Sequence, residues 1–292
     1  MVPNVEDIAL ALGARRTGSG WLAKCPAHND KNPSLSISLT ESGKLLVYCH
    51  AGCDQRSVIA ALSAMGLWSL RQSDEFVTQA HGRDWRAEQQ RDELKRIENA
   101  LRVWRQTVAP ADTLLETYWK NRAIEVQHPP SIRFHPRLKH PSGAVLPAMV
   151  GLVTDPAHGP IAVHRTFLTA NGDKAPVIMP KMALGPLKGG AVELGTPEAV
   201  TGVSEGIETG LSASQIHGVP VLAALGMRMD RVQLPEAASH IVIFGDNGDV
   251  GRRAARKAQM AILRSGRTVE LCFPPAGYGD WNDLVRDQAQ KP

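Results

Sequence analysis

The sequence predicts an α/β protein in which a parallel sheet with helices on both faces follows an α+β segment and a small β module. Three observations predict this order. Apolar strands alternate with helical patterns from about residue 199, two strands precede them at 148–155 and 161–169, and a short hairpin pattern lies near the N-terminus. Strands that alternate with helices are typical of parallel sheets with right-handed crossovers.

The N-terminal hairpin carries metal-ligand residues at its ends. The segments "SLSIS" and "LLVY" alternate apolar and polar residues on either side of the turn "TESGK". Folding this hairpin brings Cys25 and His28 close to Cys49 and Cys53. Three thiolates and an imidazole suit a tetrahedral, structural zinc ion. We therefore predict a zinc ribbon.

Two alternatives to this ligand set exist. The cysteines could form a disulfide or be unrelated buried thiols, but no signal peptide is recognised. We therefore expect a cytoplasmic protein, where disulfides are rare. His50 also has ligand spacing to Cys53, yet Cys49 directly ends the strand and thiolate is the better zinc ligand, so we favour Cys49. The fourth cysteine, Cys272, lies in the apolar run "TVELCF" and is expected in the core.

The length of 292 residues suggests about two domains. We divide the chain into a zinc ribbon (1–70), a helical linker (71–108), an α+β subdomain (109–195) and the α/β domain (196–292). The linker is expected to pack on its own protein through an apolar stripe of Leu94, Ile97, Leu101, Trp104 and Val108. No apolar run approaches the ~18 residues of a membrane span, so no membrane partner is expected. The net charge of +4 permits a nucleic-acid partner without implying one.

Acidic residues follow three of the four strands predicted in the last domain, at 199–204, 219–225, 240–245 and 268–273. Glu205 follows the first strand, Asp246 and Asp249 the third, and Asp280 and Asp283 the fourth. The carboxyl ends of parallel strands share one edge, where ligands bind. Crowded carboxylates are unfavourable unless cations offset them, and hard oxygen ligands suit Mg²⁺ or Mn²⁺. The alternative is that these residues cap the helices predicted after the strands, one of them at 231–239.

Basic residues accompany the acidic ones. The Gly/Pro-rich loop "PKMALGPLKGG" carries Lys181 and Lys188 just before the sheet, which suggests phosphate contacts. Arg252 heads a basic helix after the third strand. A phosphate contact and a solvated helix face are equally compatible with that position.

Together, these motifs resemble bacterial-type DNA primases of the kind carried by phages, plasmids and integrated mobile elements. "CPAHNDKNPSLSIS" with "YCHAGC" resembles their zinc ribbon. "SEGIETGLSA", "IVIFGDNGDVGRRAA" and "DWNDL" resemble the three acidic motifs of a Toprim domain. "HRTFLTANGDKA" and "PKMALGPLKGGAVELG" resemble the subdomain that precedes Toprim.

The resemblance implies roles for individual residues. Glu205 matches the catalytic glutamate, Asp246 the first aspartate of an Asp-x-Asp pair, and Asp280 or Asp283 the final acidic motif. The residues expected to contact nucleic acid or nucleotide are Arg165, Lys181, Lys188 and Arg252. Two departures stand out: the second cysteine pair is one residue wider than CxxC, and Gly248 stands where the second aspartate belongs, so that Asp249 is the candidate replacement.

The expected function is metal-dependent synthesis of primers from nucleoside triphosphates on single-stranded DNA, with unwinding by a helicase on another chain or region. Two rivals remain. A Toprim nuclease would use the same carboxylates to cleave a backbone, and an accessory protein with a decayed site would only bind single-stranded DNA.

Overall fold

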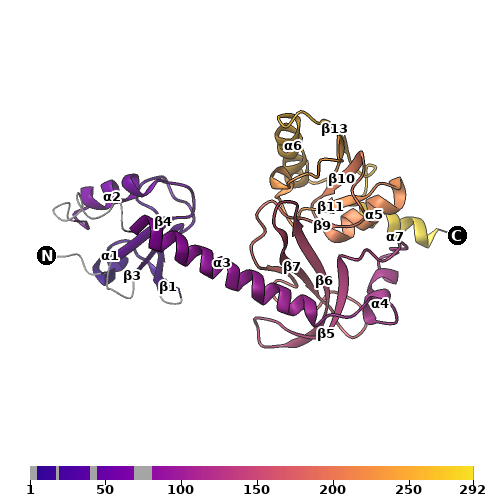
Figure 1. Ribbon diagram of the computed structural model, residues 1–292, viewed down its shortest axis with the longest axis horizontal. Coiled ribbons are helices and arrows are strands. Elements are labelled where there is room, and N and C mark those ends of the chain that lie inside the picture. The colour runs from indigo at the N-terminus through magenta and orange to yellow at the C-terminus, as the bar shows by residue number, and fades with distance from the viewer. Residues whose placement is uncertain (1–4, 18–19, 40–44, 69–80, 292) are drawn as a thin grey trace. The chain divides into compact units, whose positions relative to one another are not determined.

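The computed structural model of the chain describes residues 5–17, 20–39, 45–68 and 81–291, with side chains in the long helix described from residue 90 onward. The chain divides into two compact units, Met1–Ala87 and Glu88–Pro292, which are treated separately below. Their elements are labelled in Figure 1.

The first unit is a four-stranded antiparallel sheet with a helix before it and a helix after it. Leu35 and Ile37 of the sheet are fully buried with Ile8 and Leu62 from the two helices. The predicted hairpin is confirmed as strands β3 and β4, whereas its turn "TESGK" lies outside the described residues. The elements are α1 (Val5–Ala11), β1 (Arg15–Thr17), β2 (Gly20–Ala23), β3 (Leu35–Leu39), β4 (Leu45–Cys49) and α2 (Gln55–Ala64).

The linker prediction is partly wrong. A helix, α3, spans His81–Arg105, and two residues of the expected apolar stripe, Ile97 and Trp104, pack partly buried against the cores of the second unit. Leu94 and Val108 are both exposed, and Val108 lies beyond the helix in an isolated bridge to Phe134. Ala100 lies on the same helix face as Ile97 and Trp104 and is fully buried, so the helix packs on the neighbouring sheet through a narrower face than the whole predicted stripe.

The second unit begins with a four-stranded antiparallel meander. Both strands predicted there are confirmed, and a short helix, α4 (Leu114–Lys120), packs against the first of them. The meander runs in the order β5 (Ile132–Lys139), β6 (Val145–Asp155), β7 (Gly159–Phe167) and β8 (Lys181–Leu184).

A five-stranded, mainly parallel sheet completes the second unit and confirms the predicted fold class. Its strand order is β13-β12-β10-β11-β9, and only the edge strand β9 is antiparallel. The strands are β9 (Val192–Glu193), β10 (Val200–Ser204), β11 (Val221–Ala223), β12 (His240–Phe244) and β13 (Thr268–Cys272). The helices are α5 (Ile207–His217), α6 (Asp249–Leu263) and α7 (Trp281–Gln290).

One predicted helix is wrong. The segment 231–239 contains only the end of a short 3-10 helix, Met229–Arg231, and continues without regular structure. Pro235 lies in its middle, where it has no N–H to donate and its ring would clash with the preceding turn. The chain therefore crosses from β11 to β12 without a full helix.

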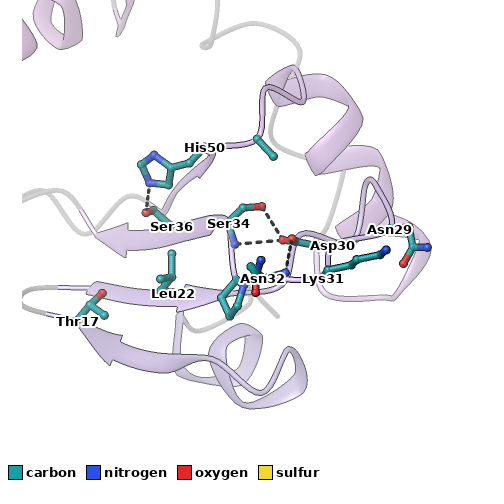
Figure 2. A pocket seen from close by; sticks show the side chains of 11 residues that line it. Thr17, Leu22, Asn29, Asp30, Lys31, Asn32, Ser34, Ser36 and His50 are labelled. Carbon is teal, nitrogen blue, oxygen red and sulfur yellow. Dashed lines mark hydrogen bonds between the residues drawn. The ribbon is translucent and has the colours of Figure 1, made fainter. Parts of the chain in front are cut away.

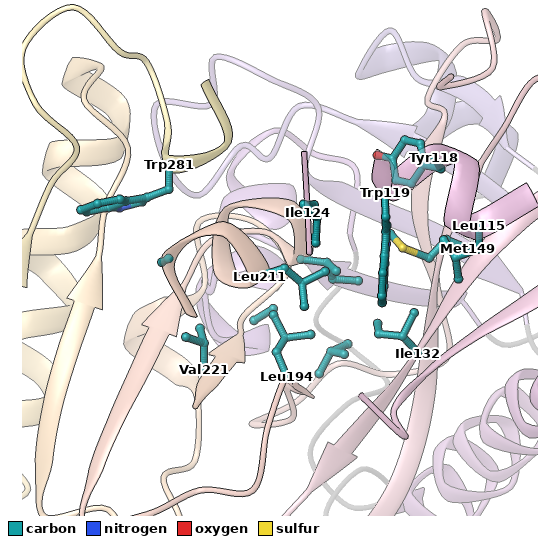
Figure 3. Close-up of a cluster of buried hydrophobic side chains, with 14 of the residues drawn as sticks. Leu115, Tyr118, Trp119, Ile124, Ile132, Met149, Leu194, Leu211, Val221 and Trp281 are labelled. Atoms are coloured by element: carbon teal, nitrogen blue, oxygen red, sulfur yellow. The ribbon is translucent and has the colours of Figure 1, made fainter. Parts of the chain in front are cut away.

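Both faces of the parallel sheet are covered. On one face, a core that includes Leu211 and Trp281 continues into Trp119, Ile132 and Met149 of the preceding segment (Figure 3). On the other face, α6 packs on β12. As expected, Cys272 is partly buried, and it packs against the core that includes Leu211 and Trp281. The continuous core makes the meander and the parallel sheet one body, which holds the acidic edge of the sheet in place.

Candidate functional site

The predicted zinc ligands form a compact group. One ligand atom from each of Cys25, His28, Cys49 and Cys53 lies within 4.8 Å of the others, and no other such Cys, His, Asp or Glu group occurs among the described residues. Nδ1 of His28 lies 3.2 Å from Sγ of Cys53 and 3.9 Å from Sγ of Cys49. Ligands of a tetrahedral zinc ion lie about 3.8 Å apart, so these residues fit the ion.

This group contains Cys49 and not His50. The imidazole of His50 points toward Ser36, with Nε2 2.6 Å from its Oγ (Figure 2). Its ring also meets Tyr48 edge to face at 4.9 Å. His50 therefore lines a shallow surface pocket beside the cluster.

Asp30 is a residue near the cluster that the sequence motif did not single out. Its carboxylate accepts the backbone N–H of Cys25 at 2.8 Å and both the N–H and the hydroxyl of Ser34, at 3.1 and 2.6 Å. The same carboxylate lies 3.6 Å from Nε2 of His28, the ring nitrogen that points away from the sulfur atoms. Figure 2 shows the hydrogen bonds between Asp30 and Ser34.

The thiols of the cluster cannot all ionise without a cation. Burial raises the pKa of Cys25, and its neighbour Cys49 raises it further. Burial acts in the same direction on Cys49, but hydrogen bonds from the backbone of Cys53 and from Ser34 lower its pKa below the ordinary value. Cys49 is therefore the first thiolate of the group, and a divalent cation is needed to ionise the others.

The strand register of the parallel sheet brings the acidic loops to one edge. Ser204 pairs with Phe244, and Phe244 pairs with Cys272, so three strands end side by side. Glu205 follows the first of these ends directly, and Asp246 follows the next by two residues. Local sequence and sheet register thus place the two carboxylates next to each other.

Asp246 is the most perturbed carboxylate of this edge. Burial raises its pKa to about 6, and the charges of Glu205 and Asp280 raise it in the same direction. Lys181 and a hydrogen bond from Thr209 oppose the shift. Three of the predicted acidic residues and one predicted lysine are therefore close enough to act on one another.

The edge also fits a divalent cation. Oδ1 of Asp246 is buried and has no hydrogen-bond partner among the described residues, although a buried carboxylate oxygen normally has one. A cation coordinated by this oxygen would satisfy it. Gly251 permits the arrangement, because a Cβ atom there would lie 2.7 Å from the carbonyl oxygen of Asp246. Hard carboxylate ligands of this kind suit Mg²⁺ or Mn²⁺.

The remaining acidic residues have other places. Asp280 caps α7 by accepting the N–H of Asp283 at 2.9 Å, and Asp283 accepts the N–H of Gly279 at 3.2 Å. Asp249 is the exposed first residue of α6 and has no hydrogen bond or ion pair in the described part of the chain, while Gly248 is the N-cap. The capping interpretation thus holds for Asp280, whose charge still acts on the buried aspartate.

Asn247 is a second residue that sequence reasoning missed. Its side-chain Nδ2 lies within 3.2 Å of the carbonyl oxygens of Pro274, Pro275 and Tyr278, and its backbone N–H donates to Gly279 at 2.8 Å. These bonds tie the loop after β12 to the loop before α7, and thus hold two acidic loops together. An asparagine in a turn carries no sequence signal for such a role.

Two of the predicted basic contacts are engaged within the protein. Arg165 is only 8% exposed and donates to the carbonyl oxygen of Ala183, so it is not free to meet a nucleic acid. Arg252 is exposed but donates to both the carbonyl and the side chain of Asn247 and stacks over Phe273. Both guanidinium groups therefore have partners within the protein, and we do not propose either as a phosphate contact.

The two predicted lysines differ. Lys188 forms an ion pair with Glu93 of α3. Lys181 donates to Glu208 at 3.0 Å, and Glu208 is a buried carboxylate that the sequence analysis did not consider. The position of Glu208 in "SEGIETG", three residues after Glu205, was the available signal.

Comparisons with known proteins agree with this division of the second unit. Residues 94–194 match the model of a domain of unknown function, DUF7146, and residues 200–291 match the model of the Toprim domain. Curated protein sequences contain no significant match to the chain. No helix in the described part of the chain is both long and apolar enough to cross a membrane.

Several solved structures resemble the chain at low identity. The primase fragment of the bacteriophage T7 primase-helicase protein is 14% identical at a TM-score of 0.40, covering 59% of this chain and 65% of that one. The zinc-binding and RNA polymerase domains of the Aquifex aeolicus primase are 18% identical at 0.36, covering 98% and 80%. A DNA primase domain from Pseudomonas aeruginosa is 20% identical at 0.36, covering 62% and 57%.

The C-terminal part of the chain, residues 200–291, is therefore a Toprim domain. The Cys/His group lies far N-terminal of it, as in the arrangement of zinc ribbon and Toprim domain that the motifs predicted. The expected Toprim domain and the expected N-terminal Cys/His group are thus both present in the chain.

Proposed function

We propose that the protein is a DNA primase, which joins nucleotides into short primers on single-stranded DNA with the help of divalent metal ions. One observation carries this proposal: the partly buried Asp246, with its buried unpartnered oxygen and raised pKa, lies close enough to Glu205 and Asp280 at the edge of a Toprim sheet to feel their charges. Carboxylates that repel one another in this way are set up to bind cations.

The metal ions would be held by Asp246 together with Glu205, with Asp280 and Asp249 as further candidates. Bound there, they would activate the attacking 3′-hydroxyl and stabilise the leaving pyrophosphate. The chain's own residues would orient them: Asn247 holds the two acidic loops together, and Lys181 supplies a positive charge beside Asp246.

The zinc ribbon would bind the single-stranded template. The exposed ring of Tyr48, edge-on to His50, is suited to stacking on a base. The pocket beside it has polar donors and acceptors from Asn29, Asn32 and Ser36. Because the chain has no P-loop motif, strand separation would fall to a helicase on another chain or on a further region of this protein.

The deciding experiment is a priming assay with single-stranded DNA, ribonucleotides and Mg²⁺ or Mn²⁺. New short oligonucleotides are expected from the wild type. Glu205→Gln, which keeps the shape and removes the charge, should lower synthesis by orders of magnitude while leaving DNA binding unchanged. The matched control is Glu236→Gln, an exposed glutamate of the same domain.

Two other outcomes would replace the proposal. Shortened DNA would identify a Toprim nuclease, which uses the same carboxylates. DNA binding without synthesis or cleavage would identify an accessory protein, a possibility raised by Gly248 in the place of the second aspartate. Synthesis by Glu205→Gln at the wild-type rate would remove Glu205 from the mechanism.

A further inference from the structure

Asp30 lies in the loop between β2 and β3, next to the Cys/His group of the first unit. Its side chain is only 6% exposed, although aspartate is mostly found at the surface. The zinc ion does not need this carboxylate as a ligand, because the four residues of the Cys/His group already supply a tetrahedral set. A charged side chain that is withdrawn from water needs partners that stabilise it. The identity of these partners indicates what the carboxylate does.

The hydrogen-bond partners of Asp30 in the described part of the chain are all donors. Oδ2 accepts the backbone N–H of Cys25 at 2.8 Å, and the N–H and hydroxyl of Ser34 at 3.1 and 2.6 Å. Oδ1 accepts the backbone N–H of Asn32 at 3.2 Å and lies 3.6 Å from Nε2 of His28. Donors on every side favour the ionised carboxylate and hold it in one orientation. A fixed negative charge therefore faces the imidazole.

His28 lies between the sulfur atoms and this carboxylate. Its Nδ1 is 3.2 Å from Sγ of Cys53 and 3.9 Å from Sγ of Cys49, so Nδ1 is the nitrogen that faces the metal position. Zinc binds the neutral imidazole, and the proton of the ring then resides on the other nitrogen, Nε2. The Nε2–H group is therefore the donor that faces Asp30. A metal-bound histidine that donates its second N–H to a carboxylate is a recurrent arrangement in metal sites.

The same carboxylate also contacts the surroundings of two other ligands. It holds the backbone of Cys25 directly. It also accepts the hydroxyl of Ser34, whose Oγ lies 3.7 Å from Sγ of Cys49. Cys25 and His28 belong to the loop after β2, whereas Cys49 ends β4. Asp30 thus connects ligands from two separate parts of the chain, which pairing of the strands brings close but does not orient.

We propose that Asp30 is a positioning residue of the zinc site, which holds the imidazole of His28 with Nδ1 toward the metal and strengthens that nitrogen as a ligand. A carboxylate behind a histidine ligand fixes the proton on the outer nitrogen and raises the basicity of the inner one. The inference concerns the first unit alone and does not depend on the proposed primase activity.

The main test replaces Asp30 by asparagine, which has the same size. The amide oxygen can take the place of Oδ2 and still accept the bonds from Cys25 and Ser34. The amide NH₂ group then faces Nε2–H of His28, so that two donors meet. Zinc affinity of the full chain, measured by competition with a chelator, should therefore fall about 10- to 100-fold. An unchanged affinity would overturn the proposal.

Asp54→Asn is the matched control. Asp54 follows Cys53 directly, so the variant also removes one negative charge near the metal position. Asp54 caps α2 by accepting the N–H of Ser57, and asparagine caps almost as well, so the local fold should persist. Zinc affinity should change far less than in Asp30→Asn. An equal loss in the two variants would overturn the proposal, because the loss of a nearby charge would then explain both.

A second background removes the imidazole. His28→Cys creates a set of four cysteines, which also binds zinc tetrahedrally. Visible absorption of the Co²⁺-loaded proteins checks that the geometry is retained. In this background Asp30→Asn should weaken zinc binding much less than in the wild type, because no ring remains to be oriented. Equal losses in both backgrounds would overturn the proposal, since Asp30 would then act on the loop and not on His28.

The wild-type protein offers a test that does not depend on whether a variant folds. Long-range ¹H–¹⁵N correlation spectra of histidine rings distinguish the nitrogen that binds metal from the nitrogen that carries the proton. In the zinc-loaded full chain, His28 should bind zinc through Nδ1 and carry its proton on Nε2. Zinc on Nε2 would overturn the proposal, because the nitrogen beside Asp30 would then have no proton to donate.

Discussion

The two candidate metal sites of this chain are built in opposite ways. In the first unit, four ligand atoms lie within 4.8 Å of one another and come from the end of β4 and from the loops that follow β2 and β4. At the Toprim edge, no group of three acidic side chains is gathered so closely within the described residues, and one buried oxygen lacks a partner. The first group offers the four protein ligands of a tetrahedral zinc site, whereas the second, if it binds metal as we propose, would leave coordination positions for substrate oxygens.

The difference teaches how each site contributes to folding. A metal that is bound by four protein ligands adds its binding free energy to the stability of a small unit. The acidic site does the reverse, because its carboxylates repel one another in the absence of cations. Metal removal should therefore unfold one unit and leave the other folded but inactive.

The largest expected effect is on the zinc site. Cys25→Ser removes a buried ligand, so the first unit should lose zinc and its ordered structure, while the second unit keeps its thermal transition. Metal analysis and calorimetry of the full chain check this result. Cys272→Ser, at the one cysteine outside the cluster, should retain the zinc. Zinc-free wild-type protein with an intact first unit would contradict the comparison.

The next effect concerns stability at the acidic edge. The pKa of Asp246 in the folded protein is about 6, above its ordinary value, so the stability that its protonated form provides is lost as the pH rises through 6. Asp246→Asn should therefore stabilise the metal-free protein by roughly 1–3 kcal/mol at pH 7 and have little effect near pH 4. Urea unfolding with a chelator at both pH values measures the difference. A variant less stable than wild type at pH 7 would show that the charge is already compensated.

Asp249→Asn asks whether the exposed aspartate is a ligand. The variant should fold normally, because a first-turn carboxylate contributes only about 0.3–1 kcal/mol to a helix. If Asp249 reaches the cation, synthesis should need several times more Mg²⁺ to reach half its maximal rate. A metal titration of the primer yield distinguishes the roles, since an unchanged midpoint would leave Asp249 with the helix alone.

Gly248→Asp restores a carboxylate at the place of the missing aspartate. The residue has an ordinary φ of −67°, and an added Cβ would meet nothing within 4 Å. Aspartate at this N-cap should stabilise α6 by a few tenths of a kcal/mol and lower the Mg²⁺ concentration needed for synthesis. Thermal unfolding and the same metal titration measure both effects. A higher metal requirement would show that glycine is needed there.

The smallest effect is expected for His50→Ala. Because the imidazole is hydrogen-bonded to Ser36 and is not part of the Cys/His group, the variant should retain one zinc per chain. Its affinity for single-stranded DNA should fall if the pocket holds template. Loss of zinc from this variant, with Ser36→Ala as the control, would return His50 to the ligand set.

A site could be predicted from the sequence when its residues lie close together in the chain or at positions that the strand pattern defines. The four zinc ligands occur within 29 residues of one another, and two strands suffice to bring them together, so spacing was enough. The acidic edge was predictable because the ends of the apolar strands can be recognised in the sequence, and parallel strands end at the same edge of a sheet. The sequence therefore indicated Asp246 and Glu205 as site residues, but it did not indicate which of the two carboxylates is the more buried.

The rest depends on contacts between distant segments. Glu208, Lys174 and Tyr118 meet only after the meander packs on the Toprim sheet, and their sequence separations of 34 and 90 residues carry no pattern. Arg165 was expected to contact nucleic acid or nucleotide, whereas its guanidinium donates to the carbonyl of Ala183 on the neighbouring strand. The helix predicted at 231–239 is wrong for a local reason, because the prediction gave too little weight to Pro235.

The hydrogen bonds of Asn247 limit which insertions and deletions this protein can accept during evolution. Surface loops usually accept insertions and deletions readily. The loop before α7 is different, because three of its carbonyl oxygens are spaced to receive one amide group from another loop. Its residues can be exchanged while the backbone path persists, but its length cannot change without releasing the neighbouring loop. A stretch of chain at the surface is thereby held to a fixed length, as if it were part of the core.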